Sequence, residues 1–239
     1  MTTLRYQRYH LDAYQQTIDT TVAAVDGNRV ALEDTVFFPQ GGGQPADHGT
    51  LTWPGGAAEV VEVAERDGQV WHELAGPVPP AGTGVHGSLD WARRYALMRM
   101  HTATHVLNGV IWRDLRAHVT GVQLQPDVAR MDFELERLTD EVAAAIQAAT
   151  NQALAADLPV RVRLLPRAEA LAIPDLVRLK SHALPEGVEL IRAIEIVGLD
   201  LQADGGTHVR STGEVGRIRI VGRDNKGRSN KRLRIALEP

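Results

Sequence analysis

Cysteine is absent from this chain of 239 residues. Disulfide bonds are therefore excluded, and so is every metal site that uses a thiolate ligand. The chain also lacks an apolar run that approaches the roughly 20 residues of a membrane-spanning helix. Its first segment, residues 1–14, has no apolar stretch of the kind found in a signal peptide. We therefore expect a cytoplasmic protein that has no membrane partner.

The composition that remains is that of an ordinary globular protein. Hydrophobic residues make up 44% of the chain and charged residues 23%. The length is sufficient for one large domain or for two modest domains with their own cores. The net charge of -4 does not by itself indicate a nucleic-acid partner.

Residues 1–89 form a pattern of short strands separated by turns. Asp26-Gly27-Asn28 and Asp67-Gly68 each stand between two apolar segments, which predicts two hairpins. The strands expected here cover residues 18–25, 29–32, 58–63, 69–74 and 86–89. Because a closed barrel leaves no exposed strand edge, we predict that residues 1–89 are a small β-barrel domain.

From residue 90 the pattern changes to mixed helices and strands. A long helix is predicted over residues 90–115 with Asp90 at its N-cap, and a second over 140–156. Strands are expected at residues 128–135, 160–165, 188–197, 215–221 and 231–237. The predicted fold class is α+β, with an N-terminal barrel and, over residues 90–239, a mainly antiparallel sheet packed on helices.

Two pairs of residues indicate a metal site. His101 and His105 are four apart in the long helix, so both imidazoles project from one helical face. Nitrogen ligands at this spacing are typical of zinc, but Thr102 stands where a helical metalloprotease needs glutamate. Asp204 and His208 are also four apart, on either side of a Gly-Gly turn whose residues permit backbone geometry closed to other residues.

Five blocks of sequence together resemble one family. They are Phe38-Pro-Gln-Gly-Gly-Gly-Gln-Pro-Ala-Asp-His-Gly-Thr50, His101-Thr-Ala-Thr-His105, Gly205-Gly-Thr-His208-Val, Thr212-Gly-Glu-Val-Gly216 and Asn225-Lys-Gly-Arg-Ser-Asn-Lys-Arg232. In this order they resemble the editing domain of alanyl-tRNA synthetases and its free-standing relatives, the AlaX alanyl-tRNA editing proteins. The resemblance implies a hydrolase that removes a wrong amino acid from the 3' end of alanine tRNA, with residues 90–239 as its metal-binding domain.

The resemblance implies one zinc ion held by His101, His105, Asp204 and His208. The family that the chain resembles usually has cysteine at this position, where this chain has Asp204. Because a carboxylate is a harder ligand than a thiolate, the zinc affinity and the identity of the metal stay open. Zinc would either lower the pKa of bound water towards about 7 or orient the amino group of the substrate, and both alternatives stay open.

Further residues are expected to contact the substrate. Three consecutive glycines let backbone amides approach a ligand closely, and with the resemblance we favour a loop that helps to enclose the aminoacyl group. The candidates for substrate binding are Gly41, Gly42, Gly43, Gln44, Thr102, Thr120, Gln123 and Thr207. Asp200 is expected to hydrogen-bond a ligand histidine, with a structural turn at the end of a strand as the alternative.

Residues 217–234 contain eight basic residues and one acidic residue, within a chain of net charge -4. This local positive segment favours contact with the RNA backbone, although it is equally compatible with a solvated sheet face. The residues expected to bind tRNA are Asn225, Lys226, Arg228, Asn230 and Arg232.

Two hypotheses follow for the function. The first is a trans-editing hydrolase that deacylates Ser-tRNA(Ala), with Gly-tRNA(Ala) as a further target, and that contacts the acceptor end of the tRNA. The alternative is a non-catalytic tRNA-binding module with a degenerate metal site. A serine-specific site would use polar groups that alanine leaves unpaired. The oligomeric state stays open between monomer and homodimer.

Overall fold

The computed structural model describes residues 6–178, 184 and 187–238. The chain divides into two compact units, one ending at Ala96 and the other beginning at Leu97. The division falls within helix α2, Trp91–Leu115. The boundary expected between residues 89 and 90 stays a prediction. No helix of the described part of the chain is long and apolar enough to cross a membrane.

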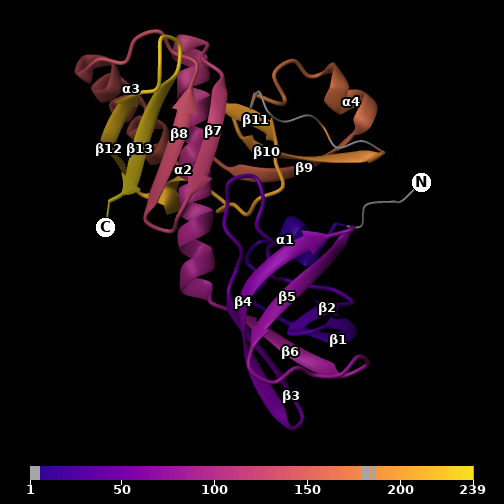
Figure 1. Ribbon diagram of the computed structural model, residues 1–239. Helices are drawn as coiled ribbons and strands as arrows, with labels where there is room; N and C mark the ends of the chain where they lie inside the picture. The colour runs from indigo at the N-terminus through magenta and orange to yellow at the C-terminus, as the bar shows by residue number, and fades with distance from the viewer. Residues whose placement is uncertain (1–5, 179–183, 185–186, 239) are drawn as a thin grey trace. The chain divides into compact units, whose positions relative to one another are not determined.

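The first unit is a closed barrel of antiparallel strands in the order β1-β2-β5-β4-β3-β6 (Figure 1). The predicted barrel and both predicted hairpins are confirmed. The strands are β1 Thr17–Asp26, β2 Arg29–Leu32, β3 Gly49–Trp53, β4 Gly56–Arg66, β5 Gln69–Ala75 and β6 Gly84–Leu89. Strand β3 and the short helix α1, Arg8–Leu11, were not predicted from the sequence.

Alternating side chains fill the barrel. Val22, Leu51 and Val60 point inward from three different strands and are almost completely buried. Phe37, from the segment between β2 and β3, is fully buried in the same core. Gly49 is required where β3 approaches β6, because a Cβ atom there would lie 2.1 Å from the carbonyl oxygen of Ser88.

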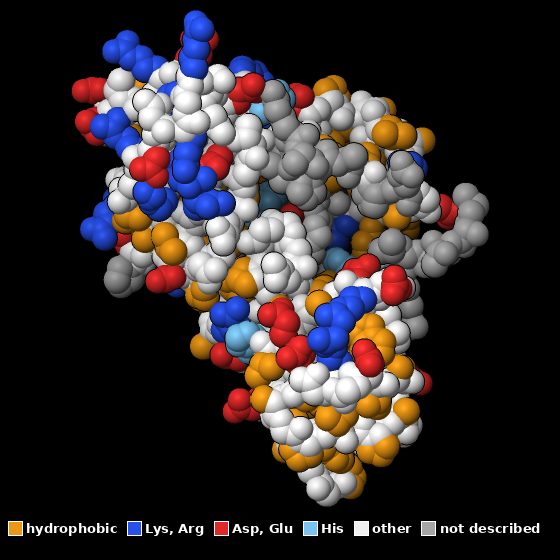
Figure 2. Space-filling model, in the orientation of Figure 1, with side chains coloured by type: hydrophobic (Ala, Val, Ile, Leu, Met, Phe, Trp, Pro, Cys, Tyr) orange, Lys and Arg blue, Asp and Glu red, His pale blue; other side chains and the backbone are white. Residues whose placement is uncertain are grey.

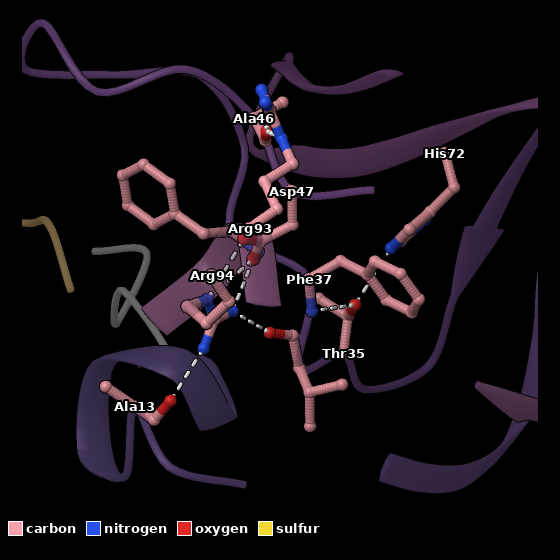
Figure 3. A network of polar contacts seen from close by, with 10 residues as sticks. Ala13, Thr35, Phe37, Ala46, Asp47, His72, Arg93 and Arg94 are labelled. Carbon is pink, nitrogen blue, oxygen red and sulfur yellow. Dashed lines mark hydrogen bonds and ion pairs between the residues drawn. The ribbon is translucent and has the colours of Figure 1, made fainter. Parts of the chain in front are cut away.

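A buried ion pair joins the barrel to the start of α2 within this unit. The guanidinium of Arg94, which is 0% exposed, donates to both carboxylate oxygens of Asp47 and to the carbonyl oxygens of Ala13 and Val36 (Figure 3). Asp47 also accepts the backbone N–H of Phe38 at 2.7 Å. Asp47 is thus bonded both to Arg94 and to the backbone of Phe38. This network therefore fixes the two ends, Phe38 and Asp47, of the segment that contains the three glycines.

The second unit contains two antiparallel sheets, in the orders β12-β13-β8-β7 and β11-β10-β9. The strands are β7 Val119–Leu124, β8 Val128–Phe133, β9 Val160–Pro166, β10 Leu190–Ile196, β11 Asp200–Ala203, β12 Ile218–Asn225 and β13 Lys231–Leu237. The helices are α3 Asp140–Ala155 and α4 Arg167–Ala172, with a 3₁₀ turn, η1, at Thr212–Val215. The predicted α+β class is confirmed, whereas β7 and β11 were not foreseen.

The helices begin where their capping residues predict. Asp90 accepts the backbone N–H of Arg93 at 3.1 Å, and Thr139 accepts that of Val142 at 3.3 Å. Asn151 of α3 bonds both backbone groups of Ile218. α3 therefore covers part of the free edge of β12, which removes an unpaired strand edge.

Candidate metal centre

Four side chains from two distant segments converge in the second unit. His101 and His105 come from α2, and Asp204 and His208 from the loop that follows β11. One ligand atom from each residue lies within 4.8 Å of all the others. Asp204 Oδ1 is 3.6 Å from His101 Nε2 and 3.9 Å from His105 Nε2, and Asp204 Oδ2 is 3.1 Å from His208 Nε2.

These distances fit a tetrahedral zinc ion. Zinc bonds to histidine nitrogen and carboxylate oxygen are about 2.0–2.2 Å long, which places neighbouring ligand atoms roughly 3.3–3.5 Å apart. The three separations from Asp204 lie on either side of that value. The side chains are also secluded, because His101 and His208 are each 3% exposed. The donor types therefore fit a zinc ion, and the side chains would have to draw closer than the observed limit of 4.8 Å to reach the tetrahedral spacing.

The carboxylate of Asp204 is held in place by its own loop. Its Oδ2 atom accepts the backbone N–H of Gly206 at 2.6 Å, which leaves Oδ1 facing the two histidines of α2. Arg192 of β10 fixes the backbone of the same residue. Its Nη1 donates to the Asp204 carbonyl oxygen at 2.6 Å, and its own backbone carbonyl oxygen accepts the Asp204 N–H at 3.3 Å. Neither Gly205 nor Gly206 has a positive φ. These two glycines therefore do not use the left-handed backbone conformation that glycine permits.

Thr102 orients one of the ligands. Its hydroxyl oxygen lies 3.1 Å from His208 Nδ1 and accepts the backbone N–H of Val209 at 3.2 Å. When His208 Nδ1 donates its proton to this oxygen, the lone pair of Nε2 is free for a metal. Thr104 donates to the carbonyl oxygen of His101 at 2.7 Å, so its hydroxyl serves the helix backbone.

The pKa values of the four side chains favour the protonation states that bind a metal ion, namely neutral histidine and ionised aspartate. Burial lowers the pKa of His101 to about 3 and the pKa values of His105 and His208 to about 4, so all three are neutral at pH 7. Burial opposes ionisation of Asp204, but the three histidines together hold its pKa well below the usual range. The cluster therefore offers three neutral imidazoles and one carboxylate to a divalent cation.

Asp200 has a different partner from the one expected. Its carboxylate forms an ion pair with Arg178 at 2.7 Å, and burial raises its pKa to about 6. Asp200 packs against α2 at Gly109, where a Cβ atom would lie 3.2 Å from the Asp200 Cβ atom. No contact described for Asp200 reaches a ligand histidine. Arg178 also lies over the ring of Trp112, with Cζ 4.9 Å from its centroid.

The glycine segment belongs to the first unit. Gly42 and Gly43 have φ values of 59° and 87°, a conformation that favours glycine. Gly41 and Gln44 exchange backbone hydrogen bonds of 3.0 and 2.9 Å, and Gln44 is completely buried. The segment is thus a tight, closed turn. Its expected role over the aminoacyl group stays a prediction.

The remaining substrate candidates lie in different surroundings. Thr120, on β7, donates to Asn230 Oδ1 at 3.0 Å, and Gln123 is exposed opposite Arg130. No described contact joins Thr120 or Gln123 to the metal ligands. Thr207 is fully buried and directly precedes the ligand His208.

The basic segment forms a hairpin between β12 and β13. Asn225 ends β12, while Arg232 already lies in β13. Lys231 is buried and donates Nζ to the carbonyl oxygens of Gly227 and Arg228. Arg232 makes two hydrogen bonds of 2.6 and 2.7 Å with Asp132. The connection between the strands therefore carries Lys226, Arg228 and Asn230, and Arg232 is committed to a carboxylate.

Sequence reasoning did not find Arg178 or Arg192. Each is a basic residue outside any motif, and its significance depends on a carboxylate that folding brings to it. A buried arginine has no local sequence signal, because its burial is decided by elements distant in the chain.

Comparisons with known proteins agree with this architecture. Residues 6–93 match the family of class II (A) tRNA synthetases, and residues 191–234 match the second additional domain of threonyl- and alanyl-tRNA synthetases. The chain is 43% identical over 220 residues to the alanine--tRNA ligase of Pyrobaculum neutrophilum. The aligned region covers 89% of this chain but only 24% of that enzyme. The chain thus spans about a quarter of the length of that relative.

Free-standing relatives match from end to end. The alanyl-tRNA editing protein AlaX-M of Methanosarcina barkeri is 38% identical over 236 residues, covering 96% of this chain and 97% of that protein. The AlaX-M protein of Methanosarcina acetivorans is 38% identical over 239 residues, with the same coverage of both chains. With this similarity, the closed barrel and the four converging ligands, the chain belongs to the AlaX family of alanyl-tRNA editing proteins.

Proposed function

We propose that this protein is a zinc-dependent hydrolase that deacylates mischarged alanine tRNA in trans, with Ser-tRNA(Ala) as its preferred substrate. The observation that carries the proposal is the convergence of His101, His105, Asp204 and His208 within 4.8 Å. The editing role named for the AlaX-M relatives supports the choice of substrate class.

Each residue of the centre has a role in this proposal. The three histidines and the carboxylate hold the zinc ion, Thr102 orients His208, and Arg192 with Gly206 positions Asp204. When bound, zinc supplies Lewis-acid chemistry at the ester carbonyl or lowers the pKa of water. The low exposure of His101 and His208 keeps bulk solvent away and strengthens every electrostatic contact at the centre.

A separate editing site is needed on physical grounds. One methyl or hydroxyl group gives only about 1–3 kcal/mol of discrimination in an apolar synthetase pocket. An editing site that hydrogen-bonds the serine hydroxyl discriminates more strongly, since alanine leaves its buried polar groups unpaired. We propose Thr207 as the candidate for this contact, because its side chain is polar, completely buried and next in the chain to His208.

The test is a time course of deacylation of serine, glycine and alanine on the same alanine tRNA, with and without a chelator. We expect serine to be released faster than alanine, with glycine as a further target, and we expect the chelator to abolish the difference. The matched pair of variants is His105→Asn, which removes a ligand, and His86→Asn, which alters a half-exposed histidine of the barrel. Equal rates for serine and alanine would exclude editing. Binding of tRNA without any hydrolysis would support the non-catalytic alternative.

A further inference from the structure

One face of the four-stranded sheet in the second unit is charged. Along β8, the buried residues Ala129, Met131 and Phe133 alternate with Arg130 and Asp132, which are only partly buried. β13 shows the same alternation, with Leu233 and Ile235 buried. We call the outward side the polar face, and it consists of Gln123, Arg130, Asp132, Asp224, Arg232 and Arg234.

The strand register arranges this face in two rows. Gln123, Arg130 and Arg234 are neighbours across β7, β8 and β13, and Asp132, Arg232 and Asp224 are neighbours across β8, β13 and β12. Basic and acidic side chains are interleaved over these strands in Figure 2. A Cβ atom at Gly222 would lie 3.1 Å from Arg234 Nε, so glycine there leaves room for the Arg234 guanidinium.

Two of the three arginines already have carboxylate partners. Arg232 makes two hydrogen bonds with Asp132, and Arg234 donates both terminal nitrogens to Asp224 at 2.7 and 2.6 Å. These pairs hold the guanidinium groups in fixed orientations, which reduces the entropy that a ligand would otherwise have to remove.

Arg130 is the exception among the arginines of this face. Within the part of the chain that the structure describes, it forms no ion pair at 4.0 Å or less, and its Nε is buried without a hydrogen-bond partner. A buried donor without an acceptor is costly, so Arg130 lacks the internal partner that the other two arginines have. The terminal nitrogens of its partly buried side chain can donate charge-assisted bonds to a phosphate oxygen. The face is also positive, because Arg130, Arg232, Arg234 and the nearby Lys226 oppose only Asp132 and Asp224.

We propose that the polar face binds the sugar–phosphate backbone of tRNA, and that Arg130 provides its main phosphate contact. The choice of tRNA as the RNA rests on the proposed function. The polar face is positive although the whole chain has a net charge of -4. The electrostatic attraction for a polyanion is therefore confined to this part of the surface. The hairpin connection with Lys226 and Arg228 extends the same surface.

The experiment measures binding of uncharged alanine tRNA by fluorescence anisotropy at several salt concentrations. Arg130→Gln is expected to weaken binding by about three- to tenfold and to flatten the salt dependence by about one contact. Arg161→Gln is the matched control, since it makes the same charge change at an exposed position of β9 in the other sheet. Arg130→Lys is expected to restore part of the affinity, and Asp132→Asn to strengthen binding.

The outcomes separate this inference from the proposed function. Each variant is also assayed for hydrolysis of a minimal seryl ester, which Arg130→Gln is expected to leave unchanged. Wild-type affinity and salt dependence for Arg130→Gln would overturn the inference, as would equal losses in Arg130→Gln and Arg161→Gln. Wild-type protein that binds tRNA through Arg130 but hydrolyses no ester would overturn the proposed function and leave the inference standing. Hydrolysis without measurable tRNA binding would do the reverse.

Discussion

The hydroxyl oxygen of Thr102 lies 3.1 Å from Nδ1 of His208, although the two residues are 106 positions apart in the chain. The same oxygen accepts the backbone N–H of Val209. A single side chain of α2 therefore positions both the imidazole and the backbone of the second ligand segment.

Replacement of Thr102 by valine is expected to weaken zinc binding about 10- to 100-fold, because valine cannot accept the proton of His208 Nδ1. Thr102→Ser keeps the hydroxyl and should restore most of the affinity. Competition with a chelator measures this, and Thr104→Val is the matched control because its hydroxyl bonds only a helix carbonyl. Equal affinities for Thr102→Val and wild type would remove Thr102 from the metal centre.

Asp204→Cys is expected to raise the zinc affinity, because a thiolate is the better ligand for a borderline-soft ion. The variant gives up the 2.6 Å bond between the Asp204 carboxylate and the N–H of Gly206, which limits the gain. Asp204→Asn should lower the affinity, since it removes the negative charge. Retention of zinc to the same degree by all three proteins in a chelator titration would mean that Asp204 is not a ligand.

Arg94→Met is expected to destabilise the barrel unit by about 3–5 kcal/mol, because it leaves the carboxylate of Asp47 buried without its partner. Urea unfolding followed by tryptophan fluorescence measures the loss. Arg93→Met is the matched control at the neighbouring position, where, among the described residues, the guanidinium bonds the carbonyl oxygen of Ala46 and no carboxylate (Figure 3). Equal losses of unfolding free energy in Arg94→Met and Arg93→Met would show that the buried Arg94–Asp47 pair does not stabilise the barrel unit more than an ordinary hydrogen bond.

His72 is expected to make the barrel unit less stable in acid. Its ring lies in the barrel core, where Nδ1 donates to the carbonyl oxygen of Val30 at 3.2 Å and Nε2 accepts from the Thr35 hydroxyl at 2.8 Å. Burial lowers the pKa of His72 from 6.5 to about 4. Between pH 6.5 and about 4, His72 is protonated in the unfolded chain but neutral in the folded protein. The free energy of unfolding therefore decreases as the pH falls from 6.5 towards 4.

The measurement compares wild type with His72→Gln by urea unfolding between pH 4.5 and 7.5 in the presence of a chelator. The difference in unfolding free energy should change by about 1.4 kcal/mol per pH unit below pH 6.5 and should be constant above it. A pH-independent difference would show that His72 is not kept neutral by the fold.

Much of the fold was predictable because it depends on local chemistry. Asp26-Gly27-Asn28 and Asp67-Gly68 specify hairpins through the backbone conformations that their residues adopt. Asp90 and Thr139 begin helices by accepting the backbone N–H of the residue three positions later. The spacing of His101 and His105 predicts a shared helical face for the same reason. Strands β7 and β11 were not predicted, since each is a short segment whose hydrogen bonds are completed by a neighbouring strand, β8 or β10.

The tertiary structure alone decided which polar side chains act together. The partner of Arg232 is Asp132, 100 residues away, the partner of Asp200 is Arg178 instead of a ligand histidine, and Asp204 is held by Arg192 of a neighbouring strand. Sequence determined the donor types and their local spacing, because these follow from side-chain chemistry and helical geometry. It did not determine the pairing of buried charges, because each pairing depends on how separate elements pack and on which groups lose contact with water.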